Sequence, residues 1–188
     1  ADLSTKATPQ GDGSYRIKGA KIFTSCAEHE LTQNIVHMVL ARIEGAPKGT
    51  KGISLFLVPR YRLDGNGEPG EHNDVVMTGM IEKMGWHGNT SSPVNFGEND
   101  GCLGWLIGEP NRGLFYMFSM MNEARIGIGL GGATLACCGY TASLAYARER
   151  RQGRLPSNKD LDSPPVAIVD HADIKRMLLA QKAYAEGA

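Results

Sequence analysis

Phe23, Thr24 and Ser25 form one short stretch whose side chains could contact a bound ligand. They end a predicted strand with an aromatic ring followed by two hydroxyls. A planar ligand could stack on such a ring and exchange hydrogen bonds with the hydroxyls. The same pattern occurs at ordinary strand ends, so these three residues alone leave both interpretations open.

Arginines mark two further stretches in the second half of the chain. Arg125 follows a segment rich in Met and Phe, so we expect it to be buried, where an unpaired charge would be costly. It indicates either a structural salt bridge or a contact to a phosphate or carboxylate of a ligand. Glu149–Arg154 contains three arginines around a glycine. These cations suit a solvated helix C-terminus, and they could equally bind a pyrophosphate on a neighbouring molecule.

Other kinds of site are not supported. Gly127, Gly129 and Gly132 spell G-x-G-x-x-G, but a dinucleotide site needs a strand before this motif, and helical sequence precedes it. Cys26 and His29 lack a second pair at ligand spacing, so we expect no metal site. No Ser, His and Asp set follows a nucleophile elbow, and no carboxylate pair in the helical half suggests acid–base work. We therefore assign no catalytic residue within the chain.

Composition narrows the possible partners. Lys+Arg and Asp+Glu both total 20 in 188 residues, so no net charge favours nucleic acid or a membrane surface. The uninterrupted apolar runs are too short to span a bilayer, and no secretion signal opens the chain. The four cysteines have no framework spacing, which favours a reducing, cytoplasmic location. The chain lacks an initial Met and stops inside a helical pattern, so we expect a fragment.

The first part of the chain, residues 1–110, has the pattern of β structure. Asp12-Gly13 predicts a hairpin, and Arg62–Asp74 has turn chemistry throughout, as in a surface excursion. Asn34–Ile43 is nearly all apolar and predicts a central strand that is apolar on both faces. Short strands at this spacing favour an antiparallel barrel or sandwich. The predicted strands are Thr5–Thr8, Tyr15–Lys18, Lys21–Ser25, Asn34–Ile43, Ile53–Val58, Val75–Met84, Ser91–Glu98 and Cys102–Ile107.

The second part, residues 111–188, is predicted to be helical. Arg112–Gln152 favours one continuous or gently bent helix of ~60 Å, with Asn111 as its N-cap. A kink near Gly129 is the competing outcome. So long a helix could not be covered by its own chain, which predicts partners. A second helix should begin after Asp170 as N-cap and carry an apolar stripe of Ile174, Met177, Leu178 and Ala185. The fold class is therefore α+β, in two domains.

The order of motifs resembles the acyl-CoA dehydrogenase family across almost the whole chain. Gly19–Ser25 is similar to the family's flavin-side strand, with Phe for its commoner Trp. Other matching motifs are Gly52–Pro59, Lys83–Gly88, Asn95–Glu98, Gly108–Gly113, Asn122–Arg125 and Tyr146–Arg154. Three segments resemble most the branch of the family that contains methylmercaptopropionyl-CoA dehydrogenase: Asn34–Arg42, Trp86–Ser92 and Ala183–Ala188. The resemblance implies a middle β-domain followed by the first helices of a C-terminal domain.

The resemblance also implies FAD as the cofactor and an acyl-CoA thioester as the substrate. In such enzymes a glutamate removes the α-proton, and hydride leaves Cβ for the flavin N5. Electrons then pass to an electron-transfer flavoprotein. By position, Phe23 would pack on the isoalloxazine, and Ser25, with Thr24 beside it, would replace the threonine that hydrogen-bonds near N5.

In the helical part, the resemblance implies that Asn122 and Arg125 line the CoA chain. Arg150 and Gln152 would contact the FAD of a neighbouring subunit, which implies a homo-oligomer. The departures from the family are that the N-terminal helical domain is absent and that Ala124 stands where some members place the catalytic glutamate. The base should then lie outside this chain, which alone should be inactive. An acyl-CoA oxidase, a non-enzymatic flavin-binding member that binds DNA, and a β-barrel module whose helices only self-associate are the alternatives.

Overall fold

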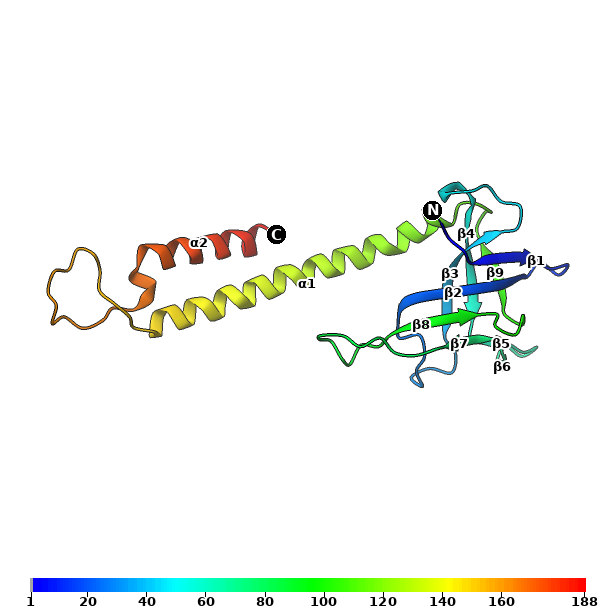
Figure 1. Ribbon diagram of the computed structural model, residues 1–188, viewed down its shortest axis with the longest axis horizontal. Helices are drawn as coiled ribbons and strands as arrows, with labels where there is room; N and C mark the ends of the chain where they lie inside the picture. Colours follow the sequence, from blue (N-terminus) through cyan, green and yellow to red (C-terminus); the bar gives the residue numbers. More distant parts are fainter. Residues whose placement is uncertain (1) are drawn as a thin grey trace. The chain divides into compact units, whose positions relative to one another are not determined.

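The computed structural model describes residues 2–188 and has the predicted α+β fold (Figure 1). It divides into two compact units, one up to Met120 and one from Met121 onward. The first unit holds nine strands, and the long helix α1 (Gly113–Glu149) begins in it and continues into the second. The second unit also contains helix α2 (Ala172–Gly187).

The nine strands fall where alternating or continuous apolar residues predict them, with two additions. They are β1 (Lys6–Pro9), β2 (Tyr15–Ser25), β3 (Val36–Ile43), β4 (Ile53–Pro59), β5 (Tyr61–Leu63), β6 (Pro69–His72), β7 (Val75–Met77), β8 (Ser91–Phe96) and β9 (Leu103–Ile107). The additions are β5 and β6, which pair as a small hairpin inside the stretch predicted as a surface excursion. The two short strands predicted before and after Gly19 are one continuous strand, β2.

The strand pairings close a ring, so of the two predicted arrangements, barrel or sandwich, the first unit has the barrel. The order is β1-β3-β4-β9-β2, and β2 pairs again with β1 (Figure 1). Every pairing in the ring is antiparallel except β1 with β3, which run parallel. The far half of β2 pairs with β8, and β8 pairs with β7, which extends the sheet beyond the ring.

The core of the first unit fills this ring. Phe56, Ile17 and Val94 are fully buried, and the Tyr15 ring packs edge-on against Phe56 with ring centroids 5.0 Å apart. Burial alternates along β3 and β8, as expected when one face of each strand points inward. The prediction of a central strand is confirmed, because β3 lies between β1 and β4. Its outer face is apolar as predicted, and Val36 and Met38 on that face are exposed in this chain.

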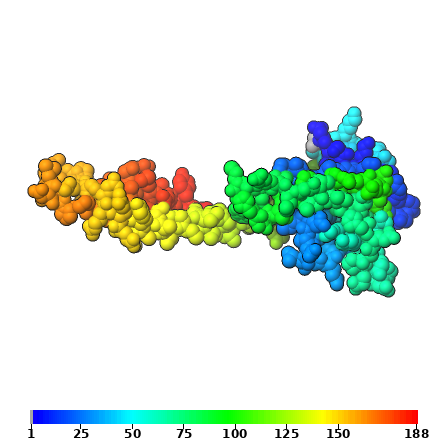
Figure 2. Space-filling view, turned by 60° about the horizontal axis from the view of Figure 1, so that its bottom comes forward, coloured from blue at the N-terminus to red at the C-terminus, as the bar shows by residue number. Residues whose placement is uncertain are grey.

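The strand predicted for Val75–Met84 ends at Met77, and the segment from residue 78 to 90 is a long loop. Figure 2 shows this green segment standing out from the sheet unit. Two backbone hydrogen bonds tie its base to β8, and the Lys83 ammonium donates to the carbonyls of Trp86 and Asn89. The loop is therefore ordered by its own polar contacts while Met84 and Trp86 remain exposed.

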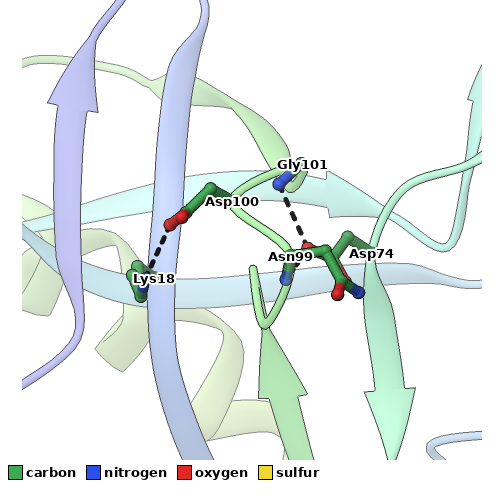
Figure 3. Close-up of polar contacts among 5 residues, drawn as sticks. All are labelled: Lys18, Asp74, Asn99, Asp100 and Gly101. Carbon is green, nitrogen blue, oxygen red and sulfur yellow. Dashed lines mark hydrogen bonds and ion pairs between the residues drawn. The ribbon is translucent and has the colours of Figure 1, made fainter.

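An aspartate organises the turn between β8 and β9. The Asp74 carboxylate accepts hydrogen bonds from the backbone N–H groups of Asn99 (2.7 Å) and Gly101 (3.1 Å) and from the Asn99 amide (Figure 3). Beside it, Asp100 pairs with Lys18 across 2.6 Å. Burial raises the pKa of Asp74, but the hydrogen bonds to its charged form outweigh burial and hold that pKa below its usual 3.8.

The lowered pKa of Asp74 predicts a loss of stability in acid. Since the folded-state pKa lies below the unfolded value near 3.8, the stabilisation is present above that value and disappears as pH falls through the folded pKa. Asp74→Asn should therefore destabilise the chain in urea at pH 7 and differ much less from the parent at pH 3. Asn tolerates the positive φ of 52° at this position. Asp162→Asn, on an exposed loop, is the control; an unchanged Asp74→Asn difference at both pH values would contradict the prediction.

Helix α1 is continuous over 37 residues, or roughly 56 Å, so the continuous-helix prediction is confirmed and no kink forms near Gly129. Its predicted cap is wrong. Asn111 has a φ of 67° and donates its backbone N–H to Ser54 Oγ (2.8 Å), and the helix begins two residues later. Gly113 allows this close approach, because a Cβ there would meet the Ser54 carbonyl carbon at 2.4 Å.

By length and composition alone, α1 could also cross a membrane, since one window of the helix reaches a mean hydropathy of 1.3. It is the one such helix within residues 2–188. Single helices of soluble proteins pass the same test, so this observation weighs little. The absence of a membrane partner stays a prediction.

Alanine substitutions at two glycines of α1 are predicted to change the stability of the chain in opposite directions. No atom beyond the helix's own neighbouring backbone lies within 4 Å of a Cβ built at Gly127, Gly129, Gly131 or Gly132 in the described chain. Gly131→Ala should therefore stabilise the isolated chain by about 1 kcal/mol, the difference in helix propensity. Gly113→Ala should destabilise it because of the backbone contact described above. Urea unfolding followed by helical circular dichroism measures both; a destabilising Gly131→Ala would reveal a partner packed on this face.

Helix α2 packs antiparallel to the second half of α1 through its apolar stripe. Leu178 and Ala185 are buried, and the Cys137 thiol contacts the Ala185 carbonyl at 3.6 Å. The Lys182 ammonium lies 5.7 Å from the Tyr140 ring centroid. The predicted cap at Asp170 is wrong, because that residue ends a short 3₁₀ turn and His171 occupies the N-cap position, where its side chain makes no capping hydrogen bond to the helix.

Candidate functional site

A β-bulge sets the geometry of the Phe23–Ser25 stretch. Lys21 pairs with Val94 and Thr24 with Ser92, so Ile22 and Phe23 together oppose the single residue Pro93 of β8. Proline has no N–H with which to continue the ladder, and a bulge re-aims the side chains that it contains. As a result the Phe23 side chain projects from the sheet and is 71% exposed.

The backbone of Phe23 is strained at this bulge. Its φ of 61° lies in the left-handed region, which a bulky aromatic residue rarely adopts. Strain of this kind costs about 1–3 kcal/mol and concentrates at ligand sites, where the surrounding structure holds it. The bulge therefore sets the backbone conformation from which the exposed ring projects.

Four hydroxyl residues lie next to the bulge. Thr24 is directly opposite Ser92, and Ser25 is directly opposite Ser91. The Ser92 Oγ is buried and has no hydrogen-bond partner within the described chain. Neighbouring strand residues point to opposite faces, so Thr24, which lines an adjoining hollow, and Ser25 offer their hydroxyls on different sides of the strand end.

A hollow of about 390 Å³ adjoins this strand end within the first unit. It opens because β1 starts at Lys6, opposite Lys18 of β2 and Arg42 of β3, so no residue of β1 fills the space between the farther parts of β2 and β3. The lining is mostly apolar, with Lys21, Thr24 and His37 as its polar members. Its size lies in the range of small-ligand pockets. The lining side chains are Leu3, Lys21, Ile22, Thr24, Val36, His37, Met38, Val39, Leu40, Phe96 and Met117.

The hollow is lined by basic side chains and by no acidic ones. Burial lowers the pKa of Lys21 to about 8, and burial followed by the charge of Arg60 lowers the pKa of His37 below 6.5. His37 is therefore neutral at pH 7, and its buried ring packs edge-on against Phe96 at 5.7 Å. No lining residue is a carboxylate. A hollow of this kind suits a largely apolar ring system that carries negative charge or electron-rich acceptors.

In the second unit, the end of α1 is fastened to the segment before α2. Arg151 forms an isolated antiparallel bridge with Ala167, and the Gln152 N–H donates to the Val166 carbonyl at 2.9 Å. The His171 Nε2 lies 2.7 Å from the Gln152 carbonyl oxygen. In extended backbone, residues two apart share a face, so the exposed side chains of Arg150 and Gln152 can reach one ligand together.

Asn122 and Arg125 lie one turn apart on α1, as expected from their spacing. Both residues are exposed in this chain, so the prediction of a buried charge at Arg125 is wrong. The described residues contain no group of three His, Cys, Asp or Glu side chains that could hold a metal ion.

Sequence reasoning missed Lys21 and His37. Each lies on the inward-facing register of its strand, and a charged or titratable residue at such a position was the available signal. The hollow itself could not be predicted from local pattern, because it depends on where β1 pairs with β2 and β3.

Comparison with known proteins gives two close relatives among those found. The chain is 42% identical over 181 residues to 3-methylmercaptopropionyl-CoA dehydrogenase of Ruegeria pomeroyi, covering 96% of the chain and 30% of that protein. It is 43% identical over 187 residues to the broad-specificity linear acyl-CoA dehydrogenase FadE5 of Mycobacterium tuberculosis, covering 97% and 31%. The chain thus spans about 30% of the length of these curated relatives. No family model matches the chain.

Solved structures share the fold at low sequence identity. ACDH-11 of Caenorhabditis elegans, in complex with C11-CoA, matches with a TM-score of 0.71 and 21% identity, covering 98% of this chain and 28% of that one. An acyl-CoA dehydrogenase of Bacillus anthracis, complexed with FAD, matches with a TM-score of 0.69 and 20% identity, covering 97% and 26%. These proteins therefore share the fold of this chain.

Proposed function

The chain belongs to the acyl-CoA dehydrogenase family, and on that basis we propose that it is the flavin-side part of an enzyme that oxidises acyl-CoA thioesters to 2-enoyl-CoA. The observation that carries the proposal is 42–43% identity over nearly the whole chain to two such dehydrogenases. Its relatives extend well beyond the matched region, so the activity is proposed for a protein that includes those regions. We refer to this chain joined to them as the extended protein.

FAD is the proposed cofactor, and when bound it would accept the substrate's β-hydride. Phe23 would pack against the flavin ring, and the hydroxyls of Thr24 and Ser25 would donate hydrogen bonds to its polar edge. Three features of the first unit support this fit: an exposed aromatic ring on strained backbone, the hydroxyls of Thr24 and Ser25 beside it, and an adjoining, mostly apolar hollow with one cation. The apolar lining would also exclude water from the reacting atoms.

The second unit would supply contacts to the substrate and to a neighbouring subunit. Arg125 and Asn122 would bind the CoA part of the thioester, and Arg150 and Gln152 would contact the FAD of the next subunit in a homo-oligomer. The fixed backbone at Gln152 and the shared face of these two side chains support the latter role. The base that removes the α-proton would come from outside this chain. Electrons would leave to an electron-transfer flavoprotein in the cytoplasm.

The visible spectrum of the extended protein tests this proposal. We expect a bound flavin, and we expect its absorbance to bleach when a saturated acyl-CoA is added without an electron acceptor. The isolated 188-residue chain should retain FAD weakly and show no bleaching, because it lacks the base. A colourless extended protein that takes up no FAD would overturn the proposal. Rapid reoxidation of the bleached flavin by air alone would favour an acyl-CoA oxidase.

A further inference from the structure

Lys21 is a half-buried cation, and no carboxylate among residues 2–188 is found paired with it. No ion pair or hydrogen bond of its ammonium is found among residues 2–188, and no carboxylate lines the hollow that it shares with Thr24. Two acidic side chains on adjoining elements are already paired, Asp100 with Lys18 and Glu28 with Arg60. At neutral pH, Lys21 therefore gives this hollow a net positive charge.

Strand geometry fixes the place of this charge. Lys21 is the last β2 residue in register with β8 before the bulge, three residues ahead of Thr24. The bulge turns Phe23 outward, whereas Lys21 has the inward register of Tyr15 and Ile17 and reaches the hollow. The exposed ring, the hydroxyls and the charge thus come from five consecutive residues of one strand. Lys21 itself is half-buried among mostly apolar lining residues, which reduces the screening of its charge by water.

We propose that Lys21 is a charge-tuning residue, which favours the more negative, reduced form of a flavin bound at this strand end over its oxidised form. The proposal rests on the FAD function inferred above and adds to it. Hydride transfer delivers two electrons and one proton to the ring, which therefore gains one unit of negative charge. An unbalanced cation nearby stabilises that charge and raises the reduction potential.

The protonation state of Lys21 is consistent with this role. Its pKa, lowered by burial to about 8, still leaves the ammonium mostly protonated at pH 7. His37, the other titratable group in the hollow, is neutral there because burial and Arg60 lower its pKa. The positive charge of the hollow at neutral pH therefore belongs to Lys21.

The reduction potential of FAD in the extended protein tests the proposal. Lys21→Met should lower the ratio of reduced to oxidised flavin at a fixed solution potential by about tenfold, which for a two-electron couple corresponds to about 30 mV. Lys21→Arg keeps the charge and should keep the potential near the parent value. Lys18→Met is the matched control, because it removes an exposed, ion-paired lysine from the same strand. If Lys21→Met prevents folding, Lys21→Gln provides the same comparison with a polar side chain.

The outcomes separate the two proposals. Bound flavin with an unchanged potential in Lys21→Met or Lys21→Gln would overturn the role of Lys21 and leave the FAD function intact. Absence of FAD in the parent would overturn the function itself. A separate readout uses the 188-residue chain with ¹³C-labelled lysine: one signal should titrate near pH 8 and disappear in Lys21→Met. An ordinary lysine pKa for that signal would also overturn the proposal, since the ammonium would then be hydrated or paired.

Discussion

Replacing Asn73 with alanine is expected to lower the free energy of unfolding by about 4 kcal/mol. Asn73 is fully buried, and its amide N–H₂ donates to the carbonyls of Pro59 and Leu103, each at 2.8 Å. Its Oδ1 accepts the Leu103 N–H (2.9 Å) and the Arg62 Nε–H (3.1 Å). The substitution leaves several buried groups unpaired at once, and each unpaired group costs about 1–3 kcal/mol.

Urea unfolding monitored by tryptophan fluorescence measures this effect. Asn66→Ala is the control, because Asn66 lies in the exposed β5–β6 turn, outside the buried network of Asn73. That control should stay within about 0.5 kcal/mol of the parent. A similarly small change for Asn73→Ala would mean that the network does not support the barrel.

The double substitution Arg150→Ala and Gln152→Ala is expected to weaken FAD binding to the extended protein by about 100-fold. A charge-assisted hydrogen bond contributes about 1.5–3 kcal/mol and a neutral one about 1 kcal/mol, and 1.4 kcal/mol corresponds to a factor of ten. Both side chains are exposed in the isolated chain and support no fold contact of their own. Stability should therefore change little while affinity falls.

Titration of the flavin-free extended protein with FAD, followed by flavin fluorescence, measures the affinity. Arg176→Ala is the matched control: it removes one arginine from the same unit, where that arginine forms an exposed ion pair with Asp173 at 2.9 Å. Equal affinity in the double variant and the control would show that the Arg150 and Gln152 pair does not contact FAD. Affinity lost only when all subunits carry the double variant, and restored in mixed oligomers, would indicate binding across the subunit boundary.

Local pattern predicted much of the fold. Alternation in β8, the continuous apolar run of β4 and the uninterrupted helical spacing from Leu114 placed these elements within a few residues. Position in sequence also placed Phe23–Ser25 correctly at the end of a strand. These features depend on residues close to one another in the chain, which is why pattern alone could predict them.

Features that depend on distant residues were missed. The bulge at Phe23 requires Pro93 across the ladder, and the hollow of Lys21 requires the start of β1 between two other strands. Asn111 has the side chain of a good N-cap, but Ser54 takes its backbone N–H and the helix begins later. The charge of Arg125 suggested burial, yet its face of α1 is open in this chain.

The parallel pairing of β1 with β3 closes the barrel through backbone hydrogen bonds among only four residues. The amides of Arg42 and Glu44 donate across that seam to the carbonyls of Thr5 (2.9 Å) and Ala7 (3.1 Å). When β1 dissociates from its neighbours, the ring becomes an open sheet whose two edge strands, β2 and β3, have unpaired backbone groups. Deuterium should then enter at Arg42 and Glu44 sooner than at the β3–β4 amides, and these edge strands offer a place where another polypeptide strand could join.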